Sequence, residues 1–338
     1  MTDYPELKLY IDGEWLDTGM RESQPVTNPA NGAVLGQVPF ANADDLDRAI
    51  AASRAGFLQW RAVSAYDRAR LIRRAAQFIR ERAERIALLI TLEQGKPLSE
   101  SRQEVSNTAD MFEWFADEGR RAYGRIIPAR EPNRQWHVVS EPVGPVAAFA
   151  AWNVPAQTMS RKVGAALAAG CSVIYKPSEE TPSTPLAIAA IFEEAGLPKG
   201  VLQVVTGNPD AISRHLLASP VIRKVTFTGS TAVGKHLARL AADNLQRLTM
   251  ELGGHAPVII FDDVDAEDVA RSAAIAKYRN AGQICTSPTR FLVQEKIYDR
   301  FVATFAETAR ALKVDDGRAD GAQMGPTANP RRVEAMER

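Results

Sequence analysis

The sequence predicts a doubly wound α/β protein, and three observations support this prediction. Short apolar runs recur between residues 143 and 261, and turn-forming residues bound them. Helical patterns separate these runs, and strands that alternate with helices pair in parallel through right-handed crossovers. The length of 338 residues makes two domains the natural expectation, and the hydrophobic content of 45% is ordinary for a protein with a core.

The first 141 residues are predicted to be mostly helical. Residues 8–40 hold only short alternating pieces. Helices are expected over residues 42–60, 66–93 and 98–121, with Gly95-Lys96-Pro97 between the last two. Seven arginines lie between Tyr66 and Arg85; because acidic residues are close in sequence, a solvated helix face is favoured over a nucleic-acid surface. Residues 122–141 are rich in Arg and Pro and predict an extended arm.

After residue 143 the pattern changes to short strands and helices. Strands are expected over residues 146–152, 172–175, 201–205, 222–228, 248–251 and 258–261. Helices are expected over residues 161–169 and 184–195, and Gly170 and Gly196 end them, as glycine commonly does. This alternation indicates the doubly wound core.

The composition argues against several classes of protein. Basic and acidic residues number 41 each, whereas a general nucleic-acid binder carries a basic excess. The two cysteines give no disulfide framework, which fits a reducing compartment. Residues 1–8 lack the pattern of a signal peptide, and no apolar run approaches a membrane span. The four histidines show no metal-ligand spacing, so we expect a cytoplasmic enzyme without a metal, a nucleic-acid partner or a membrane partner.

One cysteine stands in a setting suited to covalent chemistry. Cys285 lies among small and polar residues in the run Asn280-Ala281-Gly282-Gln283-Ile284-Cys285-Thr286. Glu251 precedes Leu252-Gly253-Gly254, 34 positions upstream of the thiol. A thiol with a carboxylate delivered by another segment is the pair needed for covalent catalysis followed by hydrolysis. No histidine forms a convincing partner for this thiol, which disfavours a papain-like pair.

Three further segments each have a functional and a structural interpretation. The turn at Gly229-Ser230 leads from a strand into a helix, where backbone N–H groups can bind a phosphate, but such turns also need glycine for steric reasons. Lys176 and Glu179 follow another strand and could hold ribose hydroxyls or form a surface loop. Asn153, between Trp and Val-Pro, could donate to an oxyanion or cap a turn.

Taken together, these segments resemble the aldehyde dehydrogenase superfamily along essentially the whole chain. The matching motifs, in order, are Trp152-Asn153-Val154-Pro155, Lys176-Pro177-Ser178-Glu179, Phe227-Thr228-Gly229-Ser230-Thr231, Glu251-Leu252-Gly253-Gly254 and Asn280-Ala281-Gly282-Gln283-Ile284-Cys285. The resemblance implies an NAD-binding domain over residues 1–121 and 141–252. It also implies an oligomerisation arm over 122–140 and a catalytic domain over 253–338.

The resemblance assigns catalytic roles to four residues. Cys285 would be the nucleophile that forms a thiohemiacetal and then a thioester. The side-chain amide of Asn153 and the backbone N–H of Cys285 would hold the oxyanion. Glu251 would activate the hydrolytic water, and Lys162 would support the proton path from it. Glu251 also argues against an acylating enzyme that uses coenzyme A, because a hydrolytic base would waste the thioester.

The resemblance also implies a nicotinamide cofactor. Lys176 and Glu179 would hold the adenosine ribose, and Gly229 and Ser230 would face the pyrophosphate. The other expected contacts are Trp152, Pro177, Ser178, Gly234 and Leu252. A carboxylate at the ribose 2′-hydroxyl repels a 2′-phosphate, so Glu179 favours NAD over NADP, although Lys176 could soften the preference.

The segment 160–171 is most similar to succinate-semialdehyde dehydrogenases. There, arginines at the positions of Arg161 and Arg279 bind the substrate carboxylate, and guanidinium groups suit such a clamp. Glutarate or 2-oxoglutarate semialdehyde would fit the same pair, and a helix-surface role for each arginine, with a neutral aldehyde as substrate, stays open. Members of the superfamily continue beyond the position of Arg338, so the C-terminal part of the catalytic domain is expected to be absent. The alternatives are therefore an active enzyme, a homodimer or homotetramer when complete, and a truncated non-catalytic nucleotide-binding chain.

Overall fold

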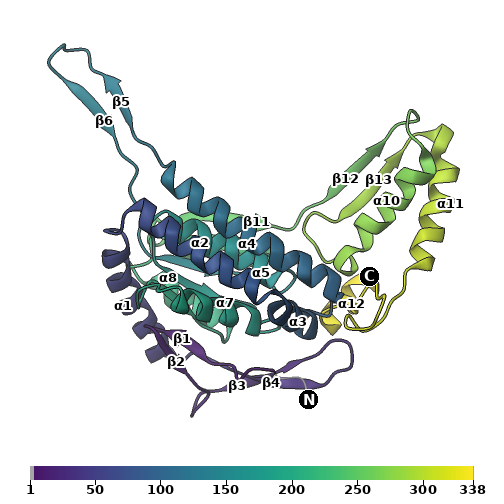
Figure 1. The fold of residues 1–338 in the computed structure, drawn as a ribbon, viewed down its shortest axis with the longest axis horizontal. Coiled ribbons are helices and arrows are strands. Elements are labelled where there is room, and N and C mark those ends of the chain that lie inside the picture. Colours follow the sequence, from purple (N-terminus) through teal and green to yellow (C-terminus); the bar gives the residue numbers. More distant parts are fainter. Residues whose placement is uncertain (1–3, 338) are drawn as a thin grey trace.

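The computed structural model describes residues 4–337, and a seven-stranded sheet forms its centre (Figure 1). The strand order is β11-β10-β7-β8-β9-β1-β2. Five strands are parallel: β7 (Val146–Phe149), β8 (Val173–Lys176), β9 (Leu202–Val204), β10 (Lys224–Gly229) and β11 (Arg247–Leu252). Strands β1 (Leu9–Ile11) and β2 (Glu14–Leu16) extend one edge in antiparallel fashion. The α/β fold class predicted from the sequence is confirmed.

The order of the parallel strands reverses between β7 and β10. From β7 the chain adds β8 and β9 on one side, and it then returns to place β10 and β11 on the other side. Loops at the carboxyl ends of two such neighbouring strands diverge to opposite faces of the sheet. They leave a crevice in which this class of fold binds its ligands.

Helices cover both faces of the sheet. The helices are α1 (Ala43–Trp60), α2 (Ala65–Glu81), α3 (Ala83–Gln94), α4 (Leu98–Arg120), α7 (Ser183–Glu194), α8 (Pro209–Ala218) and α9 (Thr231–Ala242). Helices α2, α3, α4 and α7 share a buried cluster with Val146 and Ala148 of β7. Helices α1, α8 and α9 pack on the opposite face with Ala147 and Phe149. This period of two along a fully buried strand is what a sheet covered on both faces requires. We call the seven-stranded sheet and these helices the body.

Two helix predictions are wrong in their boundaries. The expected single helix over 66–93 is two helices, because Arg82 between α2 and α3 leaves the helical region at φ −108° and ψ 17°. The expected helix over 161–169 already begins at Pro155, a residue suited to the first turn of a helix. It continues as α5 (Pro155–Met159), the π turn η1 (Ser160–Gly164) and α6 (Ala165–Ala168).

A smaller unit follows the body in sequence. Strands β12 (Ala256–Ile260) and β13 (Pro288–Val293) form a separate parallel pair, against which α10 (Ala266–Tyr278) and α11 (Glu295–Ala311) pack. Figure 1 shows this unit beside the body, and we call it the lobe. The strand expected at 258–261 therefore lies outside the large sheet. The last described helix is α12 (Pro330–Glu337).

Two hairpins complete the fold. Strands β3 (Ser23–Thr27) and β4 (Val34–Pro39) form one of them. The segment expected to be an extended arm forms the antiparallel hairpin of β5 (Arg125–Pro128) and β6 (Gln135–Val138), which projects from the body (Figure 1). Its use in oligomerisation, and the proposed domain boundaries, remain predictions. No helix within residues 4–337 has the length and apolarity needed to cross a membrane.

The arginines of α2 and its C-terminal end pair mostly with acidic side chains. Arg80 binds Asp110 at 2.7 Å and Glu113 at 2.6 Å, both on α4. Arg82 binds Glu194 of α7 at 2.7 Å. These ion pairs agree with a solvated helix face rather than a surface left open for phosphates.

Candidate active site

The crevice at the carboxyl ends of β7 and β10 is a cleft of about 1110 Å³. Five residues predicted to contact a cofactor line it: Trp152, Lys176, Ser178, Glu179 and Ser230. They come from the ends of three different strands, so the sheet topology alone gathers them. Arg331 and Arg332 of α12 also line the cleft, although no motif in the sequence points to them. Apolar side chains and a smaller number of charged ones line the cleft, which is the usual composition of a cofactor site.

Lys176 and Glu179 are buried, not part of a surface loop. The ammonium of Lys176 lies 2.6 Å from the carboxylate of Glu179, and the backbone N–H of Gly207 also donates to that carboxylate at 3.2 Å. These two bonds fix the carboxylate at the wall of the cleft. The surface-loop interpretation is therefore excluded by the geometry.

The turn after β10 depends on close packing. Ser230 caps α9, since its hydroxyl accepts from the N–H of Val233 at 3.3 Å. A Cβ atom at Gly234 would lie 2.6 Å from the side chain of Leu252, so glycine allows α9 to approach the end of β11. A Cβ atom at Gly229 would lie 2.4 Å from the ring of Phe227. Glycine is therefore required here for steric reasons. The N-terminus of α9 is also open, so the steric and the phosphate-binding interpretations are compatible. Pro177 lies between Lys176 and Ser178, in the loop that leaves β8.

The Asn153 side chain reaches the loop that carries the thiol. Its Nδ2 atom donates to the backbone carbonyl of Gln283 at 3.0 Å, two residues before Cys285. In return, the Nδ2 atom of Asn280 donates to the carbonyl of Asn153 at 3.0 Å. One N–H bond of the Asn153 amide remains free to donate. Because α5 has no side-chain cap, the structure does not support the capped-turn interpretation.

The thiol loop leaves α10 through an unusual backbone. Asn280 and Ala281 both have φ near 53°, the left-handed region that non-glycine residues rarely adopt. The N–H of Asn280 donates to the carboxylate of Glu100 on α4 at 2.9 Å. Strain of this kind persists only where surrounding contacts impose it, and it is common at functional sites.

The two cysteines differ in their surroundings. Cys285 is free and exposed, so an electrophile can reach it. Cys171 is buried in the body, and burial raises the pKa of its thiol. A buried thiol of raised pKa is a poor nucleophile, whereas an accessible one can react.

Glu251 and Lys162 form a second group of site residues. Glu251 is exposed near the end of β11. Burial lowers the pKa of Lys162 to about 8, and the charge of Glu251 opposes that shift. The Lys162 ammonium donates to the hydroxyl of Thr226 on β10 at 3.1 Å. A lysine that titrates near neutral pH beside a carboxylate is suited to proton transfer.

The two predicted carboxylate-binding arginines differ in whether they line a cavity. Arg279 lines a cavity of about 240 Å³ together with Gln157 and Ile284, the residue before the thiol. Arg161, in the π turn, is exposed and does not line that cavity. Neither guanidinium forms an ion pair within the described part of the chain, although the Glu100 carboxylate lines the same cavity as Arg279.

Three charged residues near this site are not predicted by any sequence motif. Lys96, Glu100 and Glu104 lie at the amino end of α4 and contact the Asn153 turn or the thiol loop. In the sequence, the motif Gly95-Lys96-Pro97 indicates only a helix break. The available signal was the spacing of 4 between Glu100 and Glu104, which places both on one face of the helix.

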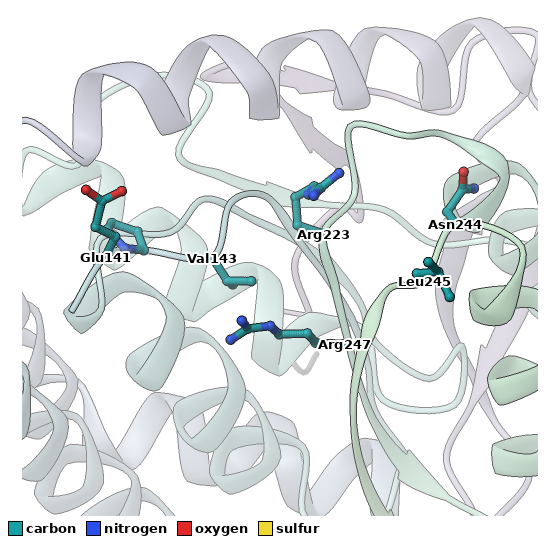
Figure 2. A pocket seen from close by; sticks show the side chains of 7 residues that line it. Glu141, Val143, Arg223, Asn244, Leu245 and Arg247 are labelled. Carbon is teal, nitrogen blue, oxygen red and sulfur yellow. The ribbon is translucent and has the colours of Figure 1, made fainter. Parts of the chain in front are cut away.

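A second cavity, of about 310 Å³, lies at the opposite ends of the strands. Figure 2 shows Arg223 and Arg247 beside Val143 and Glu141 in this cavity. Arg223 precedes β10 and Arg247 begins β11, so the cavity adjoins their amino ends. None of the predicted site residues lines it. In the part of the chain that the structure describes, no group of three or more His, Cys, Asp or Glu side chains could hold a metal ion.

A parallel sheet with a cleft at its switch point, together with an exposed thiol on a loop that the Asn153 amide contacts, is typical of an NAD(P)-dependent oxidoreductase. The comparisons then give the family. Residues 15–338 match the model of the aldehyde dehydrogenase family, and the chain belongs to that family.

Its relatives include enzymes for anionic substrates. The chain is 48% identical over 330 residues to the 4-(hydroxymethyl)benzenesulfonate dehydrogenase TsaD1 of Comamonas testosteroni, covering 98% of this chain and 69% of the relative. It is 42% identical over 327 residues to the NADP(+)-linked succinate-semialdehyde dehydrogenase GabD of Escherichia coli (strain K12), covering 97% and 68%. The crystal structure of succinate-semialdehyde dehydrogenase from Burkholderia pseudomallei superposes with a TM-score of 0.96 at 43% identity, covering 100% of this chain and 70% of that one.

Proposed function

We propose that the protein oxidises an aldehyde that carries an anionic group to the carboxylic acid, with NAD as the preferred cofactor. The observation that carries the proposal is the bond between the Asn153 amide and the Gln283 carbonyl. It holds a polar donor against the loop of an accessible thiol, beside a cleft built for a dinucleotide.

The residues of the cleft fit a nicotinamide dinucleotide. The fixed Glu179 carboxylate can accept from ribose hydroxyls, and the open N-terminus of α9 after Gly229 can receive the pyrophosphate. When bound, the cofactor accepts a hydride from the substrate carbon. Glu179 supports NAD, because a 2′-phosphate would meet its charge. Its ion pair with Lys176 reduces that repulsion, and the GabD relative is named for NADP(+).

In the proposed mechanism, the Cys285 thiolate attacks the aldehyde carbon and the carbonyl oxygen gains the negative charge. The free N–H of Asn153 and the backbone N–H of Cys285 stabilise that oxygen. Loss of hydride from the carbon leaves a thioester on Cys285. Glu251 takes a proton from water as the water attacks the thioester, which releases the acid and the thiolate. Lys162 passes that proton onward, and its pKa of about 8 suits the task.

Glu251→Gln tests this sequence of steps. We expect a burst of NADH from acylation and then near-arrest, with steady-state turnover lower by about 10²–10⁴-fold. Glu267→Gln is the matched control, since Glu267 is a carboxylate of the lobe that pairs with Arg300. Unchanged turnover in Glu251→Gln would assign the base to another residue. Absence of NADH from the parent protein with every aldehyde would refute the proposed function.

The anionic substrate is supported by the two unpaired arginines. Arg279 opens onto the cavity next to the thiol loop, and Arg161 is exposed on the helix that follows Asn153. The named substrates of relatives carry a carboxylate or a sulfonate, both of which guanidinium groups bind. Succinate semialdehyde is the leading candidate. Glutarate or 2-oxoglutarate semialdehyde, a sulfonated aldehyde and a neutral aldehyde are the alternatives.

A substrate panel with Arg161→Ala and Arg279→Ala tests this assignment. Hydrogen bonds to a charged group contribute roughly 1.5–3 kcal/mol, so each variant should lose about one to two decades of kcat/KM for the charged semialdehyde. A straight-chain aldehyde without the carboxylate should lose much less. Arg300→Ala controls for removal of a surface arginine. Equal losses on both substrates would give the arginines a structural role and leave the aldehyde dehydrogenase activity standing.

We also propose that the β5–β6 hairpin mediates formation of a homodimer or homotetramer. Ile126 and Trp136 of the hairpin are exposed apolar side chains away from the body. Ile126→Glu with Trp136→Glu should lower the mass measured by light scattering. An unchanged mass would exclude the hairpin as the interface.

A further inference from the structure

The strongest unassigned feature is a buried ion pair beneath the Asn153 turn. The Lys96 ammonium lies 2.6 Å from the Glu104 carboxylate, and their side chains are only 2% and 3% exposed. The attraction within such a pair is largely offset by the cost of removing two charges from water. The pair is therefore a poor source of net stability, and its contacts with the rest of the molecule indicate another role.

The pair binds both ends of the turn that carries Asn153. Lys96 donates from Nζ to the carbonyl oxygen of Asn153 at 2.8 Å. Glu104 accepts from the N–H of Ala156 at 2.9 Å and from that of Gln157 at 3.3 Å, in the first turn of α5. Those N–H groups have no partner inside the helix, so the carboxylate also favours the helix dipole. The turn is thus fixed by charge-assisted bonds at its start and at its end.

The same helix also binds the thiol loop. Glu100, one turn before Glu104 on α4, accepts from the backbone N–H of Asn280 at 2.9 Å. The Asn280 side chain donates to the carbonyl of Asn153, the atom that Lys96 also contacts. The amino end of α4 therefore fixes the turn with the amide donor relative to the loop with the thiol.

We propose that Lys96 and Glu104 are positioning residues that set the place of the Asn153 amide relative to Cys285. They touch the backbone of the turn and not the reacting atoms, so they act through Asn153. Donors for an oxyanion must be in place before the charge develops, and a displacement of about 1 Å can cost about 10²-fold in rate. This inference rests on the proposed function, in which the Asn153 amide stabilises the oxyanion.

The test is a paired variant, Lys96→Met with Glu104→Gln, in the whole protein. It leaves no isolated buried charge, and the amide oxygen of the glutamine can still accept from Ala156. We expect kcat to fall about 10–100-fold, with the KM for the cofactor within about twofold of the parent. The matched control is Thr91→Val with Ser101→Ala, which removes the buried 2.8 Å hydroxyl contact between α3 and α4. The control should keep the parent kcat.

A double-mutant cycle separates positioning from general damage. Asn153→Ala alone should lower kcat by about 10²–10³-fold. If the pair acts through the amide, adding the paired variant to Asn153→Ala should lower kcat by less than about twofold more. If the losses of kcat from Asn153→Ala and from the paired variant multiply in the combined variant, the proposal is wrong, because a merely structural effect is independent of Asn153.

Hydrogen exchange gives a second measurement that does not require turnover. Backbone amides of residues 152–157 should exchange several-fold faster in the paired variant, while those of α8 stay unchanged. Exchange unchanged over residues 152–157 would refute the clamp. A parent protein that oxidises no aldehyde would instead refute the proposed function, and the exchange result would then decide on the clamp alone.

Discussion

The body and the lobe bury their apolar residues to very different extents. Every residue of β7 and β8 is buried between two layers of helices, in clusters that extend through the whole body. The lobe has one small buried cluster, and Ile259 of β12 and Leu292 of β13 are 63% and 56% exposed. The body therefore buries far more apolar surface within itself than the lobe does.

Backbone contacts join the body to the segment that follows α11. The N–H of Leu98 donates to the carbonyl of Gly317 at 2.8 Å. A Cβ atom at Gly325 would lie 1.9 Å from the carbonyl oxygen of Gly95, so the two segments cross at a distance that only glycine permits. In the proposed function, the body binds the cofactor and the lobe brings the thiol to it. Variants in each region test that division of roles.

The largest effect is expected from Cys285→Ala in the lobe. Turnover should fall by about four orders of magnitude or more, because the nucleophile is lost, as in other enzymes that form a covalent intermediate. NAD binding to the body should be nearly unchanged when it is measured by titration of the cofactor fluorescence. Cys171→Ala is the control in the body and should keep turnover. Substantial activity in Cys285→Ala, or loss of NAD binding, would break the division.

Apolar truncation in the two regions should give the next largest effect. Phe192 is fully buried and packs edge-on against Phe112, with ring centroids 5.0 Å apart. Phe192→Ala should lower the free energy of unfolding by about 3–5 kcal/mol. Ile259→Ala should change it by about 0.5 kcal/mol or less, since the side chain is exposed. Urea titrations of both variants measure the difference, and similar losses would show that the lobe has a core of comparable strength.

A smaller effect of the opposite sign is expected from Lys162→Met. The pKa of Lys162 in the folded protein is about 8, below the usual 10.5, so the unfolded chain binds its proton more tightly. Burial of the charged Lys162 therefore destabilises the folded protein by its full amount below about pH 8. This cost disappears as pH rises to about 10.5. Lys162→Met should therefore stabilise the protein by about 1–3 kcal/mol at pH 7, with little gain at pH 10.5, while slowing turnover. Urea titrations at both pH values provide the check, and a gain that does not depend on pH would contradict it.

The smallest effect concerns the cofactor cleft of the body. Glu179→Ser should narrow the preference for NAD over NADP by about tenfold, because one charge near the 2′-position is lost. Titration of both cofactors against parent and variant measures the ratio. Glu194→Ser, a surface carboxylate on α7, is the control and should leave the ratio unchanged. A parent that already prefers NADP would show that Lys176 outweighs the carboxylate.

Much of the fold was predictable because its signals are local. The buried strands β8 and β9 are short apolar runs, and Gly170 and Gly196 end the preceding helices with positive φ. The break at Arg82 was not predictable, because apolar spacing continues across it. The start of a helix at Pro155 was missed, because the same proline also suits a turn.

The residues of the candidate site also differ in whether the sequence predicts them. Residues at strand ends, such as Glu179 and Ser230, could be predicted because parallel topology gathers them at one edge. Lys96 and Glu104 could not, since their role depends on burial against a turn more than 45 positions away in sequence. Charged residues are expected to be exposed, and only the structure shows which of them are buried.

The π turn at Ser160–Gly164 has a consequence for insertions and deletions. A π turn contains one residue more than an α turn, and each helical residue advances by roughly 100°. Deleting a single residue here would allow continuous α-helix to form and would rotate the preceding segment, with Asn153, relative to the helix that follows. Lys162 lies within the turn, so its direction towards Thr226 depends on the extra residue. A one-residue gap at this point in a related sequence would therefore mark a reorganised site and not a harmless shortening.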